Sequence, residues 1–232
     1  MNHLHERPDV AGRGEVSRRP DGRLFLSIDT WDDADFALLA ADMLPALPRP
    51  LHTVVDEADT ELRSRWESAG FTTRRREWEY LLPTAPGQAS APAGVTIGPP
   101  ADAELLNSAE DVIRAEIEAT VGWEEMPAEI LPRPAVPDVT KYVVAESAGD
   151  YVGLVRLAAV PRQPRIGLIA VRADRRRRGI GRALLTYVLN ALHDKGIPAA
   201  SAEVNERNPA AIALFEGAGA RRVGSNLELV LR

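Results

Sequence analysis

The feature that most constrains the fold is a segment in which a strand pattern, an arginine–glycine loop and a helix pattern follow one another without a gap. Residues 165–171 read RIGLIAV, an apolar run of strand length, and residues 181–194 carry apolar side chains at helical spacing. The loop between them, RADRRRRGIG, places four consecutive arginines before Gly179 and Gly181. Such a loop gathers unpaired backbone N–H groups at the positive end of the helix dipole. The segment therefore predicts an α/β fold with an anion-binding loop.

The chemistry of this loop suits a phosphate or a pyrophosphate. Glycine lets the backbone approach a ligand without a Cβ in the way, and arginine donates paired hydrogen bonds to phosphate oxygens. A Walker A loop is excluded because no lysine follows the glycines, and a GxGxxG loop is excluded because Leu184 stands where the third glycine would be. Two alternatives stay open, a solvated basic loop and a nucleic-acid patch, although the net charge of −6 argues against the second.

Hydrophobic periodicity divides the chain into an arm, two folded parts and a connection. Residues 1–22 are polar and predict a flexible arm, and residues 83–94 (PTAPGQASAPAG) predict a linker. Residues 23–82 predict a half-domain in the order strand, helix, strand, helix, strand, and residues 95–232 predict the larger domain. Residues 95–100 begin the larger domain. The strands predicted for it span 141–146, 151–160, 165–171, 199–204, about 220–224 and 226–232, and its helices span 103–122, 181–194 and 208–219.

The two parts repeat one another at a shift of 149 residues. WESAGF (66–71) matches FEGAGA (215–220), and VVDEAD (54–59) falls on EVNERN (203–208). The repeat fails where the first part has DTWDD (29–33) in place of the arginine–glycine loop. Aspartates at that point would repel a pyrophosphate, so we expect the first part to serve structure, either in place of a dimer partner or as a wall of the acceptor site.

These motifs resemble the GCN5-related N-acetyltransferase (GNAT) superfamily. RRRGIG (176–181) is similar to the R/Q-x-x-G-x-G/A loop of that family, and residues 202–219 are similar to its closing strand–helix segment. The resemblance covers about 95–232 well and 23–82 as a degenerate half copy, as in a tandem protein. It implies a mixed, mostly antiparallel sheet flanked by helices, with an extra N-terminal half-domain, and an enzyme that moves the acetyl group of acetyl-CoA to a primary amine.

The same resemblance assigns the cofactor contacts. The pyrophosphate of acetyl-CoA would lie on the loop, in contact with Arg176, Arg178, Gly179, Ile180, Gly181, Arg182 and Ala183. Backbone atoms of Ala170, Val171 and Arg172 would hold the acetyl carbonyl and the pantetheine arm. Asn208 would contact that arm, with a plain helix N-cap as the alternative, and Phe215 would pack against it.

The catalytic groups implied by the family are incomplete in this sequence. The reaction is attack of a neutral amine on the thioester, with a general base that takes the ammonium proton. Position 215 is Phe where the family commonly has the Tyr that protonates the thiolate, so solvent, a backbone group or a residue such as Tyr187 must replace it. The candidate bases are Glu124, Glu125, Glu203 and Asp150, and the candidate acceptor contacts are Trp123, Glu124, Glu146 and Tyr151. For the Trp123–Glu125 stretch, a half-buried tryptophan beside two solvated carboxylates is the alternative.

Charge suggests the acceptor without deciding it. The net charge of −6 favours a small cationic amine, such as a metabolite or an aminoglycoside antibiotic that is inactivated by acetylation. Protein N-termini and lysine side chains are alternative acceptors. A regulatory module that binds CoA without catalysis is the alternative from another class.

Composition excludes several other chemistries. The chain has no cysteine and only four histidines, none at metal-ligating spacing in a structured segment, so we expect no disulfide and no metal. No apolar run has the length of a membrane span, and the N-terminus lacks the pattern of a signal peptide. We therefore expect a cytoplasmic monomer or homodimer without membrane or nucleic-acid partners.

Overall fold

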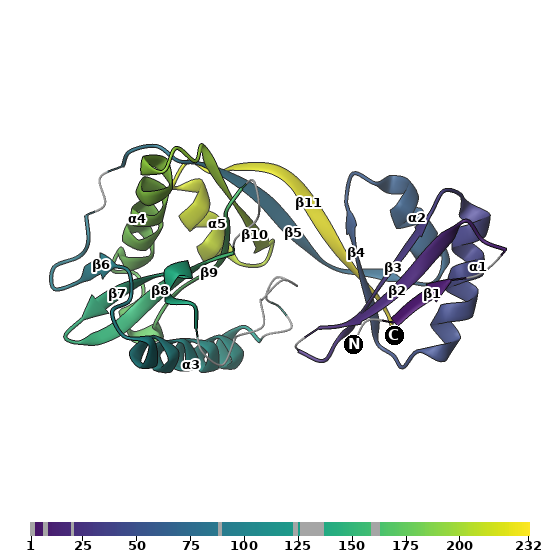
Figure 1. The fold of residues 1–232 in the computed structure, drawn as a ribbon, viewed down its shortest axis with the longest axis horizontal. Coiled ribbons are helices and arrows are strands. Elements are labelled where there is room, and N and C mark those ends of the chain that lie inside the picture. Colours follow the sequence, from purple (N-terminus) through teal and green to yellow (C-terminus); the bar gives the residue numbers. More distant parts are fainter. Residues whose placement is uncertain are drawn as a thin grey trace. The chain divides into compact units, whose positions relative to one another are not determined.

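The computed structural model describes residues 3–6, 9–19, 21–87, 90–122, 125, 137–158 and 163–232. The chain forms two compact units, Met1–Trp78 with Gly224–Arg232 (unit 1) and Glu79–Val223 (unit 2) (Figure 1). Strands β5 (Thr72–Pro83) and β11 (Arg221–Leu231) contribute residues to both. Helices flank a mixed, mostly antiparallel sheet, so the predicted fold class is confirmed.

Unit 1 is a sheet with two helices packed on one face. Its other elements are β1 (His3–Glu6), β2 (Gly12–Arg18), β3 (Leu24–Thr30), α1 (Asp33–Met43), β4 (Leu51–Asp56) and α2 (Thr60–Ser68). The strand order is β1-β2-β3-β4-β11-β5, and only the pair β3 and β4 is parallel among the pairs whose register is described in this unit. Its core includes Trp66, whose ring meets Phe36 and Phe71 edge-on at centroid distances of 5.0 and 4.8 Å. These contacts hold α1 and α2 to the sheet.

Most of the described residues between 3 and 22 form strands and not the flexible arm that the sequence predicts for 1–22. Strands β1 and β2 pair with each other, and β2 pairs with β3 along its length. Side chains alternate along β2, so Val16 is buried in the core while Arg13 is exposed and Glu15 is half-buried. Gly14 lies so close to Met43 of α1 that a Cβ would collide with the thioether. Only two of the seven residues of β2 are buried, and neither is large, so the apolar pattern was too weak to predict a strand.

The C-terminal strand overturns the predicted division into domains 23–82 and 95–232. The two short strands predicted at 220–224 and 226–232 form one strand, β11. Its residues from Asn226 to Leu231 pair antiparallel with β4, opposite Asp56 to Leu51. Unit 1 is therefore completed by the end of the chain. Local patterning marks a strand but carries no information about its partner, so the sequence could not show this pairing.

A charged cluster inside unit 1 centres on Glu228 of β11, a residue that is 2% exposed. Its Oε1 atom accepts hydrogen bonds at 3.0 Å from Arg23, His52 and Arg74, and its Oε2 lies 2.7 Å from the Arg75 guanidinium. Burial alone would raise the pKa of Glu228, but the hydrogen bond from His52 and the charges of the arginines lower it to about 2. The carboxylate is therefore charged in the folded state at every pH at which the protein is normally handled.

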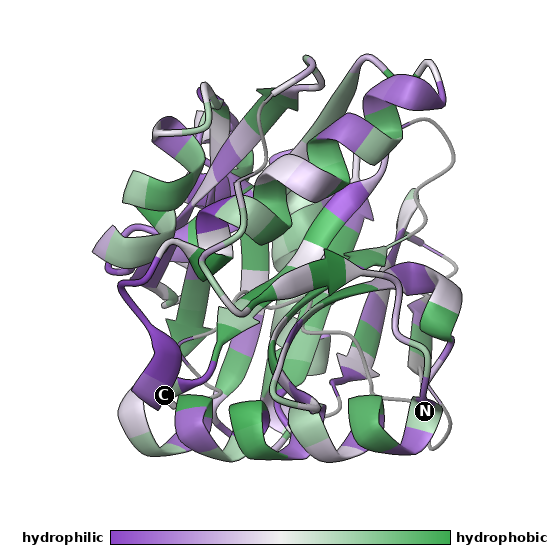
Figure 2. Ribbon diagram, turned by 90° about the vertical axis from the view of Figure 1, so that its left-hand side faces the viewer, coloured by the Kyte–Doolittle hydropathy of each residue, from purple (hydrophilic) through white to green (hydrophobic). Residues whose placement is uncertain are grey.

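Unit 2 is a sheet with helices on both faces. Its further elements are β6 (Thr96–Gly98), α3 (Ala103–Thr120), β7 (Tyr142–Ser147), β8 (Asp150–Ala158), β9 (Arg165–Val171), α4 (Ile180–Asp194), β10 (Ala199–Asn205) and α5 (Pro209–Glu216). Leu154 of β8 packs with Leu106 and Ile113 of α3, whereas its neighbour Gly153 faces Leu184 of α4. Because successive strand residues point to opposite faces, α3 and α4 cover opposite sides. Hydrophobic and hydrophilic residues lie side by side along the helices, as one-sided burial requires (Figure 2).

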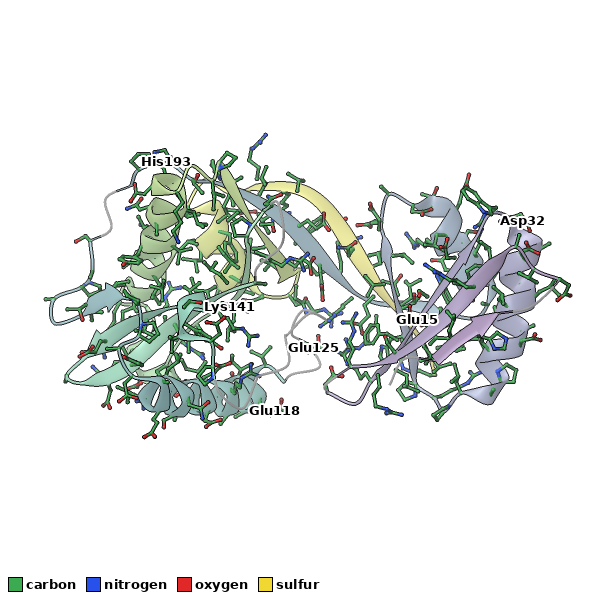
Figure 3. The ribbon with its side chains drawn as sticks, viewed as in Figure 1. Glu15, Asp32, Glu118, Glu125, Lys141 and His193 are labelled. Atoms are coloured by element: carbon green, nitrogen blue, oxygen red, sulfur yellow. The ribbon has the colours of Figure 1, made fainter. Side chains whose placement is uncertain are left out.

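The predicted linker at 83–94 begins as part of unit 2. Gly87 and the side chain of Asn190 on α4 exchange two hydrogen bonds of 2.9 Å. Nδ1 of His193, near the end of α4 (Figure 3), lies 2.8 Å from the carbonyl oxygen of Thr84. The segment rich in Pro, Ala and Gly is thus fastened along a helix, and the boundary between the units falls earlier, after Trp78. Among the described residues, no helix is long and apolar enough to cross a membrane.

We predict that the substitution Glu228→Gln destabilises unit 1 by about 3 kcal/mol at pH 7, because it removes the buried charge that Arg23, Arg74 and Arg75 share. The unfolded carboxyl titrates near pH 4.5 and the folded one near 2. The stabilisation from the charged form is therefore complete above about pH 5 and is lost as the pH falls toward 2. Urea unfolding of both proteins across this range checks the prediction. A difference in the free energy of unfolding that stays constant from pH 7 to pH 2 would contradict it.

Candidate functional site

The loop between β9 and α4 has a backbone that few residues adopt. After β9 the chain makes a short 3-10 helix (Ala173–Arg175). Arg177 then has φ 64° and Gly179 has φ 86°, both in the left-handed region. Helix α4 begins at Ile180 with Gly179 as its N-cap, and no side chain caps it. The helix end is therefore open toward the loop.

Main-chain amides collect at this open end. Within residues 163–232, which the structure describes without a gap, no amide from 177 to 182 donates a hydrogen bond, and the first to do so is that of Ala183, to the Gly179 carbonyl at 3.0 Å. Six consecutive donors at the positive end of α4 form an anion site. Ile180 and Ala183 turn their own side chains into the core, and of their two amides only that of Ile180 is open to a ligand.

The arginines of the loop add uncompensated positive charge. Arg176 donates from Nε to the Val171 carbonyl at 3.1 Å, and Arg178 donates to the Asp174 carbonyl at 3.2 Å, so both lie folded along the loop. Arg175 instead pairs with the Asp174 carboxylate at 3.2 Å. In the part of the chain that the structure describes, Arg176, Arg177, Arg178 and Arg182 form no ion pair with a carboxylate. Their charge is available to an anionic ligand.

Strands β9 and β10 separate beside this loop. They run parallel, and the register between their described residues consists of one pair, Ser201 opposite Arg165. On the other side, the register between β8 and β9 passes from Leu168 to Ile166 and skips Gly167, which marks a β-bulge. A bulge bends its strand, so Gly167 accounts for the divergence of β9 from β10.

The divergence leaves backbone groups of β9 unpaired on the β10 side. The amide of Arg172 donates to the Val152 carbonyl of β8 at 2.9 Å. Hydrogen-bonded pairs alternate along an antiparallel ladder, so Ala170 also turns its groups to β8, whereas Ile169 and Val171 turn theirs toward the gap. Of the three residues predicted to hold the pantetheine arm, only Val171 is suitably oriented. Ala170 and Arg172 turn their main-chain groups toward β8, and Ile169, which the sequence did not single out, shares the orientation of Val171.

Gly181 lies where the gap meets the open helix end. A Cβ at this position would stand 3.8 Å from Val171 on β9 and 3.8 Å from Leu214 on α5. Alanine would therefore fit, while a large side chain would fill the space between β9, α4 and α5.

Asn208 and Phe215 are both engaged in structure. The Asn208 side chain accepts from the Ala211 amide at 3.0 Å and is the N-cap of α5, as the alternative reading had it. Phe215 is buried and stacks on Tyr80 of β5, with ring centroids 6.1 Å apart. The Tyr80 hydroxyl donates to Glu216 and accepts from Arg222, and burial raises its pKa. Neither ring offers a proton to a thiolate.

The candidate bases occupy different places. Glu203, on β10, pairs with Arg165 at 3.3 Å. Asp150 is exposed at the start of β8, opposite Ser147 of β7. The Glu125 carbonyl accepts from the Asn205 side chain at 2.7 Å, which ties this residue to the end of β10. Glu124 and Trp123 lie outside the described residues.

The remaining acceptor candidates are not brought to the gap. Glu146 is exposed on β7 and lies opposite Tyr151 of β8. The Tyr151 hydroxyl accepts from the Ala101 amide at 2.9 Å and so supports the start of α3, and its predicted contact with the acceptor stays a prediction. Tyr187 is half-buried on α4.

Sequence reasoning missed two further residues at the loop. The Glu116 carboxylate of α3 accepts from the Ala173 amide at 2.7 Å and so fastens the start of the loop. Gly167 carried a usable signal, because glycine inside a strand often marks a bulge. Glu116 carried none, because its partner is far away in the sequence.

Comparison with known proteins agrees with this geometry. A GCN5-related N-acetyltransferase from Sphaerobacter thermophilus has a similar structure, with a TM-score of 0.71 and 18% identity, over 95% of this chain and 76% of that one. A tandem GNAT protein from the clavulanic acid biosynthesis pathway reaches a TM-score of 0.67 at 14% identity, over 99% of this chain and 83% of that one. Likeness at such identities shows the fold.

A sequence relative matches over a shorter stretch. The ribosomal protein bS18-alanine N-acetyltransferase of Escherichia coli is 45% identical over 51 residues, 22% of this chain and 34% of that protein. The match thus spans about a third of the relative. The model of the acetyltransferase (GNAT) family matches residues 105–220, half of the chain, including β7 to β10, the open loop and α5. With its bulged β9 and open α4, the chain belongs to the acetyltransferase (GNAT) family.

Proposed function

We propose that the chain transfers the acetyl group of acetyl-CoA to a primary amine. The observation that carries this proposal is the run of amides at 177–182, which donate no hydrogen bond in the described part of the chain. Acetyl-CoA carries a diphosphate, the kind of group that such a helix end binds. Arg176, Arg178 and Arg182 would add guanidinium contacts to the diphosphate oxygens.

The pantetheine arm would lie in the gap between β9 and β10. Ile169 and Val171 direct main-chain groups toward it, and an amide-bearing chain can pair with them as a short extra strand. The diphosphate site at the end of β9 and these groups along β9 lie in the order in which acetyl-CoA carries its diphosphate and its pantetheine arm. The thioester would then lie toward the point where the strands meet, near Ser201 and Arg165.

Glu203 is our proposed general base. Among the described candidates it alone lies on one of the two diverging strands. Its pairing with Arg165 at 3.3 Å favours the charged carboxylate, the form that accepts a proton. The amine must lose its ammonium proton to attack the thioester, so a carboxylate here, directly or through a water, would raise the fraction of reactive amine.

The acceptor we propose is a small cationic amine, for which the net charge of −6 offers long-range attraction. Aminoglycosides belong to this class. A second candidate is the α-amine of a protein, which the similarity to the bS18-alanine acetyltransferase favours. A cytoplasmic location is part of the same proposal.

We further propose that unit 1 descends from the same fold as unit 2. The repeat at a shift of 149 residues has structural counterparts: Asp59 and Asn208 cap α2 and α5 in the same way, each accepting from the amide three residues on. Helix α2 starts at Thr60 and α5 at Pro209, and both helices are followed by a glycine of positive φ and a long strand. Sequence identity alone is too low over most of the repeat to carry this proposal.

The pair of substitutions Gly181→Trp and Gly181→Ala tests the cofactor site. We expect tryptophan to reduce acetyl-CoA affinity at least about a hundredfold, because it fills the space beside the amides, and alanine to change it by less than about tenfold. Isothermal calorimetry measures both. Unchanged affinity in the tryptophan variant would place the cofactor elsewhere.

The substitution Glu203→Gln tests the base. We expect kcat to fall about 10²-fold with little change in KM for acetyl-CoA, and the loss to shrink as rising pH supplies neutral amine. Asp150→Asn is the matched control and keeps wild-type kinetics. A uniform loss at every pH would assign Glu203 a structural role instead.

A panel of amines tests the acceptor. The chain has no cysteine, so a thiol reagent reports only the CoA that is released. We expect turnover with an aminoglycoside or a polyamine to exceed turnover with a peptide that begins with alanine. The reverse order would support the protein acceptor. Binding of acetyl-CoA without turnover on any amine would support a regulatory module.

A further inference from the structure

A groove of about 1010 Å³ lies between α1 and α2 of unit 1. Short side chains line its length: Ala37, Ala40 and Ala41 of α1, and Ser64, Ser68 and Ala69 of α2. Both helices follow strands of the parallel pair β3 and β4, so both start at the same edge of the sheet. In α/β sheets this edge is where ligands bind. The volume suits a small molecule.

The mouth of the groove combines an exposed indole with carboxylates. The side chain of Trp31 is 91% exposed, an unusual position for the largest apolar side chain. Asp32, Asp33 and Glu61 line the same end, and Asp32 lies at the start of α1 (Figure 3). The one basic residue lining the groove, Arg65, bonds to Asp33 at 2.6 Å. Two carboxylates therefore remain beside the indole.

The groove occupies the place in unit 1 that the cofactor cleft occupies in unit 2. At the shift of 149 residues, α1 and α2 correspond to α4 and α5. The charges are reversed, however. The Asp32 side chain accepts from the Asp35 amide at 2.8 Å, and the Asp32 carbonyl accepts from Phe36, so a carboxylate caps this helix start. Residues 29–36, all described, include no positive φ.

We propose that this groove binds an organic cation with an aliphatic chain, an alkylammonium. Its head group would lie against the Trp31 ring, with Asp32 and Glu61 as counter-charges. Its chain would extend between the helices over the alanines toward Leu44, which also lines the groove. A diphosphate would meet two carboxylates and a helix end already capped by a carboxylate, so we do not expect acetyl-CoA here. This inference does not rest on the proposed function, because it concerns unit 1 alone.

The test uses the full chain and hexyltrimethylammonium as the probe, followed by tryptophan fluorescence and calorimetry. We expect saturable binding that weakens with salt, and no saturable binding of hexanol, which has the same chain without the charge. Trp31→Ala should weaken binding about tenfold, since the exposed indole supplies the cation–π contact. Glu61→Gln should weaken it about threefold, and Glu67→Gln, on the same helix outside the groove, should not change it.

Ala37→Phe should abolish binding by filling the groove. Should that variant misfold, Trp31→Ala still decides the matter, because its exposed side chain does not support the core. Equal affinity of wild type and Trp31→Ala would overturn the proposal, as would a second equivalent of acetyl-CoA that competes with the probe. Gly181→Trp should leave probe binding unchanged, so failure here and failure of the cofactor site are separate results.

Discussion

The separation of β9 from β10 is the constraint on which the candidate site depends. Two parallel neighbours in a sheet normally satisfy each other's backbone groups, and burying such groups without partners is costly. Here the bulge at Gly167 turns β9 away, and Ile169 and Val171 are left with groups that a ligand can satisfy. The open start of α4 lies at the end of the same strand. One local irregularity thus joins a strand-like binding edge to an anion site, an arrangement suited to a long ligand with a charged end.

Unit 1 shows how a similar set of elements takes a different electrostatic character. Its two helices begin with aspartates that cap them, and its loop before α1 carries aspartates in place of the arginines. Its sheet depends on the end of the chain, because β11 supplies both apolar residues to the core and Glu228 to the arginine cluster. A buried carboxylate among several arginines is stable only while all partners are present. The C-terminal residues therefore belong to the fold of unit 1, although the residues that they contact there lie far away in the sequence.

Position 215 has Phe where the family commonly has Tyr. The phenol that packs beside it is held by other side chains and does not serve as a proton donor to a thiolate. Phe215 packs on Tyr80, whose hydroxyl is held between Glu216 and Arg222. The protein thus uses a phenol there to fasten β5 and α5 within unit 2. If the chain is a transferase, proton return to the departing thiolate must come from solvent or from another group. For the proposed reaction, the remaining proton transfer is deprotonation of the amine, the role that we propose for Glu203.

By itself, the sequence determined the elements and the chemistry of the loop. Strand and helix periods are local, and the Gly179–Gly181 spacing with its arginines is also local, so both could be read directly. Tertiary structure decided what depends on distant partners: the pairing of β11 with β4, the strands within 1–22, and which backbone groups of β9 remain unpaired. It also showed backbone partners that the sequence could not show, the Ala101 amide for the Tyr151 hydroxyl and the Ala211 amide for the Asn208 side chain. Register and partner choice are global properties, and no short window of sequence encodes them.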